Sequence, residues 1–131
     1  MAAQPPHIML VDDEPAIRLT LSMLLKRSGY SVTTAASGDE ALSLLEQQAY
    51  DLVLLDLIMP GIGGLDLARQ VQSQRPGAAI LVLTGSDALE DVSRSGFDYI
   101  LKTTSPRDVL ARVAAVLESQ RSAAVGEASA Q

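Results

Sequence analysis

The sequence contains no cysteine and no tryptophan, and only 3% of its residues are aromatic. Without cysteine there is no disulfide framework, no thiolate metal site and no thiol nucleophile. The composition is therefore compatible with a reducing compartment. The scattered aromatic residues offer no platform for stacking on single-stranded nucleic acid. The single histidine, His7, lies in the flexible N-terminal lead, where we expect it to have no role. A Ser-His-Asp triad built on another histidine is therefore excluded.

Basic residues and long apolar runs are also scarce. Ten Lys and Arg stand against sixteen Asp and Glu, which gives a formal net charge of -6. No basic cluster interrupts this acidic background, so we expect no direct contact with nucleic acid. No apolar run approaches the roughly 20 residues that span a bilayer, and the first residues lack the basic and apolar regions of a signal peptide. We expect a cytoplasmic protein that does not bind membranes.

The composition fits one globular domain. The chain has 131 residues, of which 47% are hydrophobic and 20% charged. At this length roughly two thirds of the unfolded chain's surface can be buried, so no disulfide or metal is needed for stability. We expect a flexible lead over residues 1–6, a folded domain over 7–119, and a disordered tail or the start of a linker over 120–131. The tail is predicted because its Ala-rich and Ser-rich composition has no apolar periodicity.

Strand and helix signals alternate along the domain. Compact apolar runs predict strands at residues 8–11, 30–35, 51–56, 79–83 and 99–101. Helical periodicity and end signals predict helices at residues 15–27, 39–48, 65–74, 87–94 and 106–119. Strict alternation predicts an α/β fold with one five-stranded parallel sheet and five helices on both faces, a three-layer arrangement similar to flavodoxin. We expect the strand order 2-1-3-4-5.

Polar side chains follow the predicted strands where each strand ends. Asp12 and Asp13 follow the first strand, Asp56 ends the third, Thr84 follows the fourth and Lys102 the fifth. In an open parallel sheet, ligands bind beyond the carboxyl ends of the strands, where the strand order reverses. Adjacent strands lie roughly 4.8 Å apart, so the three carboxylates meet there and repel one another. Such a cluster must raise a pKa, recruit Lys102 or bind a hard cation, and Mg²⁺ suits it.

Each of these residues also has a simpler interpretation. Asp13 is a reasonable N-cap for the first helix, and Asp56 is a reasonable acid at the start of a loop. Thr84 before glycine is typical of a turn, and Lys102 of a solvated strand end. Tyr99 in the last strand is equally typical of a core residue.

The motifs in their order are similar to a known family. The fragments are Val11-Asp12-Asp13-Glu14, Leu54-Leu55-Asp56-Leu57-Ile58-Met59-Pro60-Gly61, Thr84-Gly85 and Asp98-Tyr99-Ile100-Leu101-Lys102. Together they resemble the receiver domain of two-component response regulators, of the stand-alone CheY-like kind, over about residues 7 to 119.

That resemblance implies an aspartyl phosphate. Asp56 would be the phosphoacceptor, and the donor would be a phosphohistidine on a sensor histidine kinase or phosphotransfer protein, or a small phosphodonor. Asp13, Asp56 and the backbone carbonyl of Ile58 would bind Mg²⁺ directly, and Asp12 would help through water. The output would be altered binding to a downstream protein, with no output domain expected on the chain itself.

Further roles follow from the same resemblance. Lys102 would pair with one phosphoryl oxygen and Thr84 would hydrogen-bond another. Thr84 and Tyr99 would form the switch that responds to phosphorylation. Ile58 and Ser86 occupy positions that resemble the family's rate-tuning sites, and an apolar Ile58 is expected to orient hydrolytic water poorly.

Two departures from the family pattern affect these expectations. Thr103 follows Lys102 where receivers usually carry a cis-proline, and a cis bond before Thr would cost roughly 2.5 to 4 kcal/mol, so we expect a trans peptide. The span from Thr84 to Lys102 is also short, mainly at the fourth helix, so the usual dimer contact is in doubt and we expect a monomer or weak homodimer.

Two other function classes stay open. The first is a receiver-like interaction module that works independently of phosphate. The second is an enzyme, either an aspartate-nucleophile phosphatase or a flavin or dinucleotide binder. Against the enzyme, Ile58 stands where such a phosphatase has its second Asp, and no G-x-G-x-x-G follows the first strand.

Overall fold

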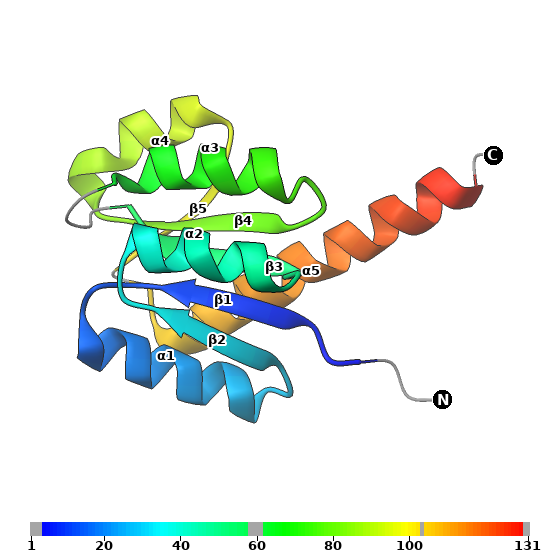
Figure 1. Cartoon of the computed structure of the whole chain (residues 1–131), viewed down its shortest axis with the longest axis horizontal. Helices are drawn as coiled ribbons and strands as arrows, with labels where there is room; N and C mark the ends of the chain where they lie inside the picture. Colours follow the sequence, from blue (N-terminus) through cyan, green and yellow to red (C-terminus); the bar gives the residue numbers. More distant parts are fainter. Residues whose placement is uncertain (1–3, 58–61, 103, 130–131) are drawn as a thin grey trace.

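The computed structural model describes residues 4–57, 62–102 and 104–129 (Figure 1). The strands are β1 (His7–Val11), β2 (Ser31–Ala35), β3 (Leu52–Asp56), β4 (Ala79–Thr84) and β5 (Asp98–Leu101). The helices are α1 (Pro15–Arg27), α2 (Gly38–Gln47), α3 (Gly64–Gln74), the 3₁₀ turn η1 (Ser86–Ala88), α4 (Leu89–Ser95) and α5 (Pro106–Ser129). Strands and helices thus alternate as the sequence predicts.

The five strands form one parallel sheet in the order β2-β1-β3-β4-β5. This confirms the predicted α/β fold and strand order. Val11 lies opposite Leu55 in the register of β1 with β3, and Leu83 lies opposite Asp56 in the register of β4 with β3. The carboxyl ends of the three central strands therefore meet at one edge of the sheet.

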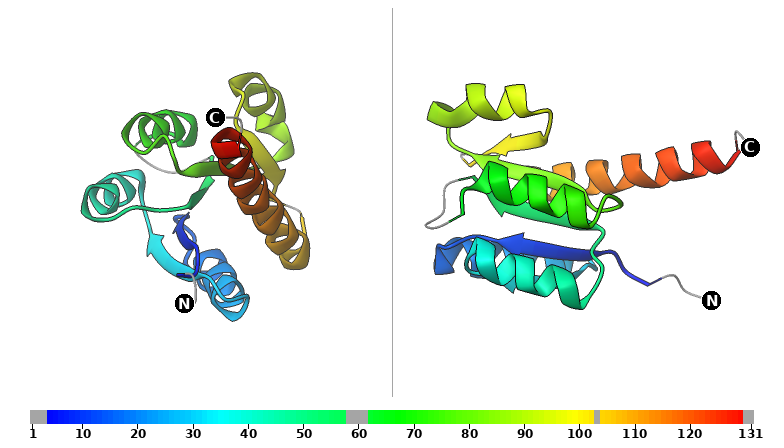
Figure 2. Two further views of the ribbon diagram at one scale, coloured as in Figure 1. Left: turned by 90° about the vertical axis from the view of Figure 1, so that its right-hand side faces the viewer. Right: turned by 45° about the horizontal axis from the view of Figure 1, so that its top comes forward.

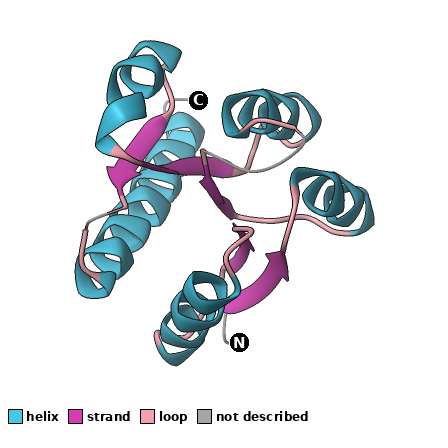
Figure 3. Cartoon of the chain, turned by 90° about the vertical axis from the view of Figure 1, so that its left-hand side faces the viewer, coloured by secondary structure: helices cyan, strands magenta, loops and turns pink. Residues whose placement is uncertain are grey.

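Helices lie on both sides of the sheet (Figure 3), and an apolar core fills the space between the helices and each face. Met9 and Val11 of β1 pack with α2, α3 and α4, while Ile8 and Leu10, the alternate residues, pack with α1 and α5. Strands buried on both faces read as continuous apolar runs, which is why β1, β3 and β4 show no polar alternation. The helices therefore form the outer layers of a three-layer structure (Figure 2).

The last helix is longer than the sequence predicts. The sequence predicts an end near residue 119, but α5 continues to Ser129 and extends beyond the sheet (Figures 1 and 2). Residues 120–129 are therefore helical, where we expected a disordered tail. Extending an existing helix needs no new nucleus, so the helix propensity of Ala, Arg, Gln and Glu suffices without apolar periodicity. The division of the chain into lead, domain and linker stays a prediction.

The placement of His7 in a flexible lead is also wrong. His7 is the first residue of β1, and its backbone N–H donates to Asp51 Oδ2 at 2.7 Å. Its Nε2 lies 2.7 Å from Thr33 Oγ1 in a hydrogen bond, and its ring packs against Tyr50 with the centroids 4.5 Å apart. His7 therefore fixes the start of β1, at the edge opposite the carboxylates.

In the part of the chain that the structure describes, none of the helices combines the length and apolar character that a membrane span requires.

Helix α1 offers a matched test of the core. Leu25 is fully buried, whereas 63% of Leu19 is exposed on the same helix. Leu25→Ala should lower the free energy of unfolding by about 2 to 5 kcal/mol because it leaves a cavity. Leu19→Ala should change it by less than about 0.5 kcal/mol. Urea denaturation of both variants measures the difference, and equal losses would contradict the packing described here.

Candidate phosphorylation site

Three carboxylates meet at the carboxyl edge of the sheet. Asp12 and Asp13 follow β1 and Asp56 ends β3, and each offers a carboxylate oxygen within 4.8 Å of the others. Asp12 and Asp56 are buried, whereas Asp13 is exposed. The strand ends predicted from the sequence therefore do come together, and the exposed member leaves the cluster open to solvent.

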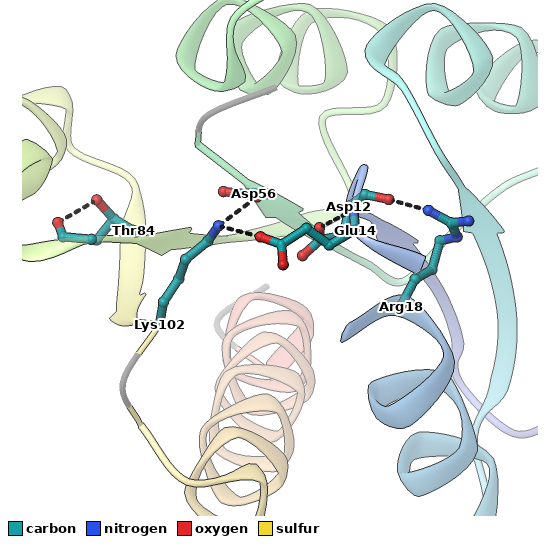
Figure 4. Close-up of polar contacts among 7 residues, drawn as sticks. Asp12, Glu14, Arg18, Asp56, Thr84 and Lys102 are labelled. Atoms are coloured by element: carbon teal, nitrogen blue, oxygen red, sulfur yellow. Dashed lines mark hydrogen bonds and ion pairs between the residues drawn. The ribbon is translucent and has the colours of Figure 1, made fainter. Parts of the chain in front are cut away.

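The turn from β1 into α1 fixes the orientation of Asp12. Its backbone N–H donates to Ala35 O at 3.1 Å, and its Oδ1 accepts from the Glu14 N–H at 2.9 Å. Arg18 Nη1 donates to the Asp12 carbonyl at 2.6 Å (Figure 4). Glu14, and not Asp13, is the N-cap residue of α1. The simpler interpretation of Asp13 as the helix cap is therefore wrong.

Lys102 reaches the cluster from the end of β5. Its Nζ donates to Asp56 Oδ2 at 2.7 Å and lies 3.8 Å from Glu14 Oε1 (Figure 4). Its backbone N–H donates to Thr84 O at 2.8 Å, which continues the pairing of β5 with β4. Burial acts to lower the pKa of Lys102, but the hydrogen bond and charge of Asp56, with the charges of Asp12 and Glu14, outweigh it and raise that pKa. Lys102 is therefore a charged partner of Asp56 and not simply a solvated strand end.

Within the described part of the chain, a buried carboxylate oxygen of Asp12 lacks a hydrogen-bond partner. Asp12 Oδ2 is buried and meets no hydrogen-bond donor among the described residues. Burial is the main cause that raises the pKa of Asp12, and the nearby charge of Asp56 adds to it, while the Glu14 hydrogen bond and Lys102 oppose it. A buried acceptor without a donor is uncommon and calls for an ion or water. Asp12, Asp13 and Asp56 together offer three hard oxygen ligands, which fit Mg²⁺.

The remaining predicted residues lie around this cluster. Thr84 is fully buried at the end of β4, and its Oγ1 donates to Gly85 O at 3.1 Å. Tyr99 of β5 is partly buried and packs against the core shared with α2, α3 and α4. Ser86 begins η1, and its side chain is outside what the structure describes. Ile58 and Thr103 lie outside the described residues, so the carbonyl ligand and the trans peptide stay predictions.

Comparison with known proteins decides the family. A family model of the response regulator receiver domain matches residues 8–114. The chain belongs to the response regulator receiver family. The resemblance seen in the sequence is confirmed, and the domain is a signalling module of two-component systems.

Related receivers share both sequence and fold. TcrX, a probable transcriptional regulatory protein of Mycobacterium tuberculosis, is 37% identical over 118 residues, covering 87% of this chain and 50% of TcrX. A CheY-like receiver domain protein of Methanospirillum hungatei is 32% identical, with a TM-score of 0.84, covering 90% of this chain and 98% of that one. TrrA of Thermotoga maritima, solved in complex with Mg²⁺-BeF, is 36% identical, with a TM-score of 0.77. The match covers 85% of this chain and 98% of TrrA. This receiver spans about half the length of the curated relatives it matches.

Two residues of the receiver site were missed from the sequence. Glu14 lies near Lys102, and Arg18 holds the turn that carries Asp12. The signal for Glu14 was present, because it is the third consecutive acid after β1. Arg18 had no comparable signal, since a basic residue one turn into an amphipathic helix is ordinary.

The effect of the acidic cluster on the stability of the fold can be measured with Asp12→Asn. This variant should raise the free energy of unfolding of the metal-free protein at neutral pH by about 1 kcal/mol or more, because it removes a buried charge, one oxygen of which has no partner among the described residues. The pKa of Asp12 is raised on folding, so its ionisation makes the folded state less stable as pH rises above the ordinary Asp range. The gain should therefore disappear in acid.

Urea denaturation at neutral and acidic pH checks this expectation. Glu118→Gln, which removes one exposed acid from α5, is the control for lost charge in general. A gain of the same size in Glu118→Gln would show that net charge, and not the site, is responsible.

Proposed function

We propose that this receiver accepts a phosphoryl group on Asp56 from a phosphohistidine donor, that the transfer depends on Mg²⁺, and that phosphorylation changes binding to a partner protein. The observation that carries this proposal is Asp12 Oδ2, which is buried and has no hydrogen-bond partner among the described residues. It lies in the cluster with Asp13 and Asp56, and Lys102 is 2.7 Å from Asp56. A site that only stabilised the fold would have no reason to keep this oxygen unpaired.

Asp12, Asp13 and Asp56 would hold the ion, together with the backbone carbonyl of Ile58. Bound Mg²⁺ would supply positive charge that neutralises the carboxylates and the phosphoryl oxygens. In support, the related TrrA was solved in complex with Mg²⁺-BeF. The exposure of Asp13 leaves a route for the donor to approach the site.

In the transfer, an Asp56 carboxylate oxygen attacks phosphorus in line with the bond to the leaving nitrogen. The new P–O bond forms as the P–N bond breaks, and the electron pair of that bond remains on the imidazole nitrogen of the donor. Lys102 then pairs with a phosphoryl oxygen, so the positive charge that now contacts Asp56 stays beside the growing negative charge.

The proposed switch uses Thr84 and Tyr99. The Thr84 hydroxyl would leave Gly85 O and donate to a phosphoryl oxygen, which vacates space beside β5. Tyr99, which is only partly buried, would turn into that space. Phosphorylation shifts the partner-binding surface only to the extent that these contacts differ between the two states.

The donor would be a sensor histidine kinase or phosphotransfer protein, and acetyl phosphate would serve as a small phosphodonor. The seven-residue α4 supports a monomer or weak homodimer, because it shortens the face through which receivers commonly associate. We place the protein in the cytoplasm, where such donors act.

Intact mass after incubation with Mg²⁺ and acetyl phosphate tests the proposal. The wild-type chain should gain one phosphoryl group, and chelation of the metal should abolish the adduct. Asp56→Asn should give no adduct, because the nucleophile is gone. Asp66→Asn, which removes an exposed carboxylate on α3, should react like the wild type.

No adduct on a folded wild-type chain with fresh donor would contradict the proposal. It would favour the phosphate-independent interaction module, and Mg²⁺-dependent binding of beryllofluoride would then be absent as well. Turnover of a generic phosphate ester would instead point to a phosphatase.

The lifetime of the aspartyl phosphate tests the role of Ile58. Ile58→Asn should accelerate hydrolysis of the phosphorylated form by about tenfold, less than the roughly 10²-fold that a 1 Å misplacement of a reacting group can cost, because the amide can orient the attacking water. Loss of the adduct with time, followed by intact mass after donor removal, gives the rate. An unchanged rate would count against a rate-tuning role at this position.

A further inference from the structure

The two described ends of the connection from β3 to α3 are in direct contact. Gly64 N–H, at the start of α3, donates to Leu57 O at 2.9 Å. A β-carbon on Gly64 would lie 2.5 Å from Leu57 O and 2.7 Å from Asp56 O, so a larger residue would push α3 away from the residue after the phosphoacceptor. The start of α3 therefore packs directly against the backbone of Asp56 and Leu57, so a shift of one would displace the other.

This connection also contacts the start of α2. Ile62 is partly buried and packs against the core under α2 and α3, two helices that lie side by side (Figure 2). A β-carbon on Gly38, the buried first residue of α2, would overlap Ile62 Cγ2 and lie 3.4 Å from Ile62 Cβ. The absence of a side chain at Gly38 is thus what admits the branched side chain of Ile62.

The surroundings of Gly38 hold it in place. Ser37 Oγ accepts from the Glu40 N–H at 3.1 Å, and Glu40 Oε1 accepts from the Ala36 N–H at 2.6 Å. Ser37 is the N-cap of α2, and Glu40 bonds back to the residue before that cap, so the two bonds together fix the first turn of α2. An overlap at Gly38 would therefore be relieved by movement of Ile62 and its loop, and less by movement of the helix.

We propose that Gly38 is a positioning residue for the phosphorylation site, acting through its contact with Ile62 on the loop that follows Asp56. The contact seats the far end of this loop on the capped start of α2, while Gly64 joins it to Leu57. The loop also carries Ile58, the proposed carbonyl ligand, so the inference rests on the proposed function for its effect on metal binding. The effect of Gly38 on the position of the loop does not depend on the proposed function.

The test compares Gly38→Ala, Ile62→Leu and the double variant. Leucine keeps the volume of isoleucine but has no branch at Cβ, so Ile62→Leu removes the methyl group that Gly38→Ala would meet. Gly77→Ala is the matched control, because a β-carbon there meets nothing within 4 Å. Alanine is also the better helix former, so α2 itself should not suffer from Gly38→Ala.

The first measurement needs no metal. Exchange of the Gly64 amide proton, followed by NMR, reports opening of its bond to Leu57 O. Gly38→Ala should accelerate this exchange by on the order of tenfold relative to wild type and Gly77→Ala. The double variant should return it to near the wild-type rate. If Gly38→Ala does not fold, Ile62→Ala removes the same contact from the other side without overlap and should accelerate the exchange alike.

The second measurement is the Mg²⁺ concentration that gives half-maximal adduct formation with acetyl phosphate. Gly38→Ala should raise it by about tenfold, the low end of the effect of losing an outer support of a metal site. A return of this Mg²⁺ concentration to near the wild-type value in the double variant would support overlap with Ile62 as the cause of the change.

Two outcomes would overturn the inference. One is an unchanged Gly64 exchange rate in Gly38→Ala. The other is a general loss of stability with the half-saturating Mg²⁺ concentration unchanged, which indicates a structural role alone. If the wild type forms no adduct while Gly64 exchange responds as expected, the proposed function fails and the contact itself is supported.

Discussion

The parallel pairing of β1 with β3 is the constraint on which the site depends. Val11 lies opposite Leu55, so the acids that follow these residues, Asp12 and Asp56, end neighbouring strands. Apolar residues on both faces of the sheet fix this register, because a slip of one residue would exchange the two faces of a strand. Burial of the core therefore forces two carboxylates together where water cannot fully solvate them.

Lys102 compensates only part of this charge. It contacts Asp56 directly, but Asp12 keeps a buried oxygen without a partner in the described part of the chain. In the metal-free site, one lysine offsets part of the carboxylate charge, and the proposed cation would supply the positive charge that is still missing. A second cationic side chain beside these carboxylates would offset more of their charge and remove the reason to bind metal.

The sequence predicts the parts of this arrangement that depend on local signals. Asp56 and Lys102 could be placed because strand ends are visible as breaks in apolar runs, and alternation of strands and helices brings those ends to one edge. The approach of Glu14 to Lys102, and of Ile62 to Gly38, depends on side chains from distant elements, which no local pattern encodes. The length of α5 was missed for a different reason, since helix propensity without periodicity leaves no amphipathic signal.

The contacts of Thr84 set a limit on how the proposed switch can work. Its hydroxyl already donates to Gly85 O, so a phosphoryl oxygen must replace an existing bond and not fill a vacancy. A charge-assisted bond exceeds a neutral one by about 1 kcal/mol, whereas moving a two-state surface from mostly off to mostly on requires about 5 kcal/mol. Thr84 alone is therefore insufficient. The rest would have to come from the pairing of Lys102 with a phosphoryl oxygen and from repacking of Tyr99, so the proposed switch has to couple several contacts across β4 and β5.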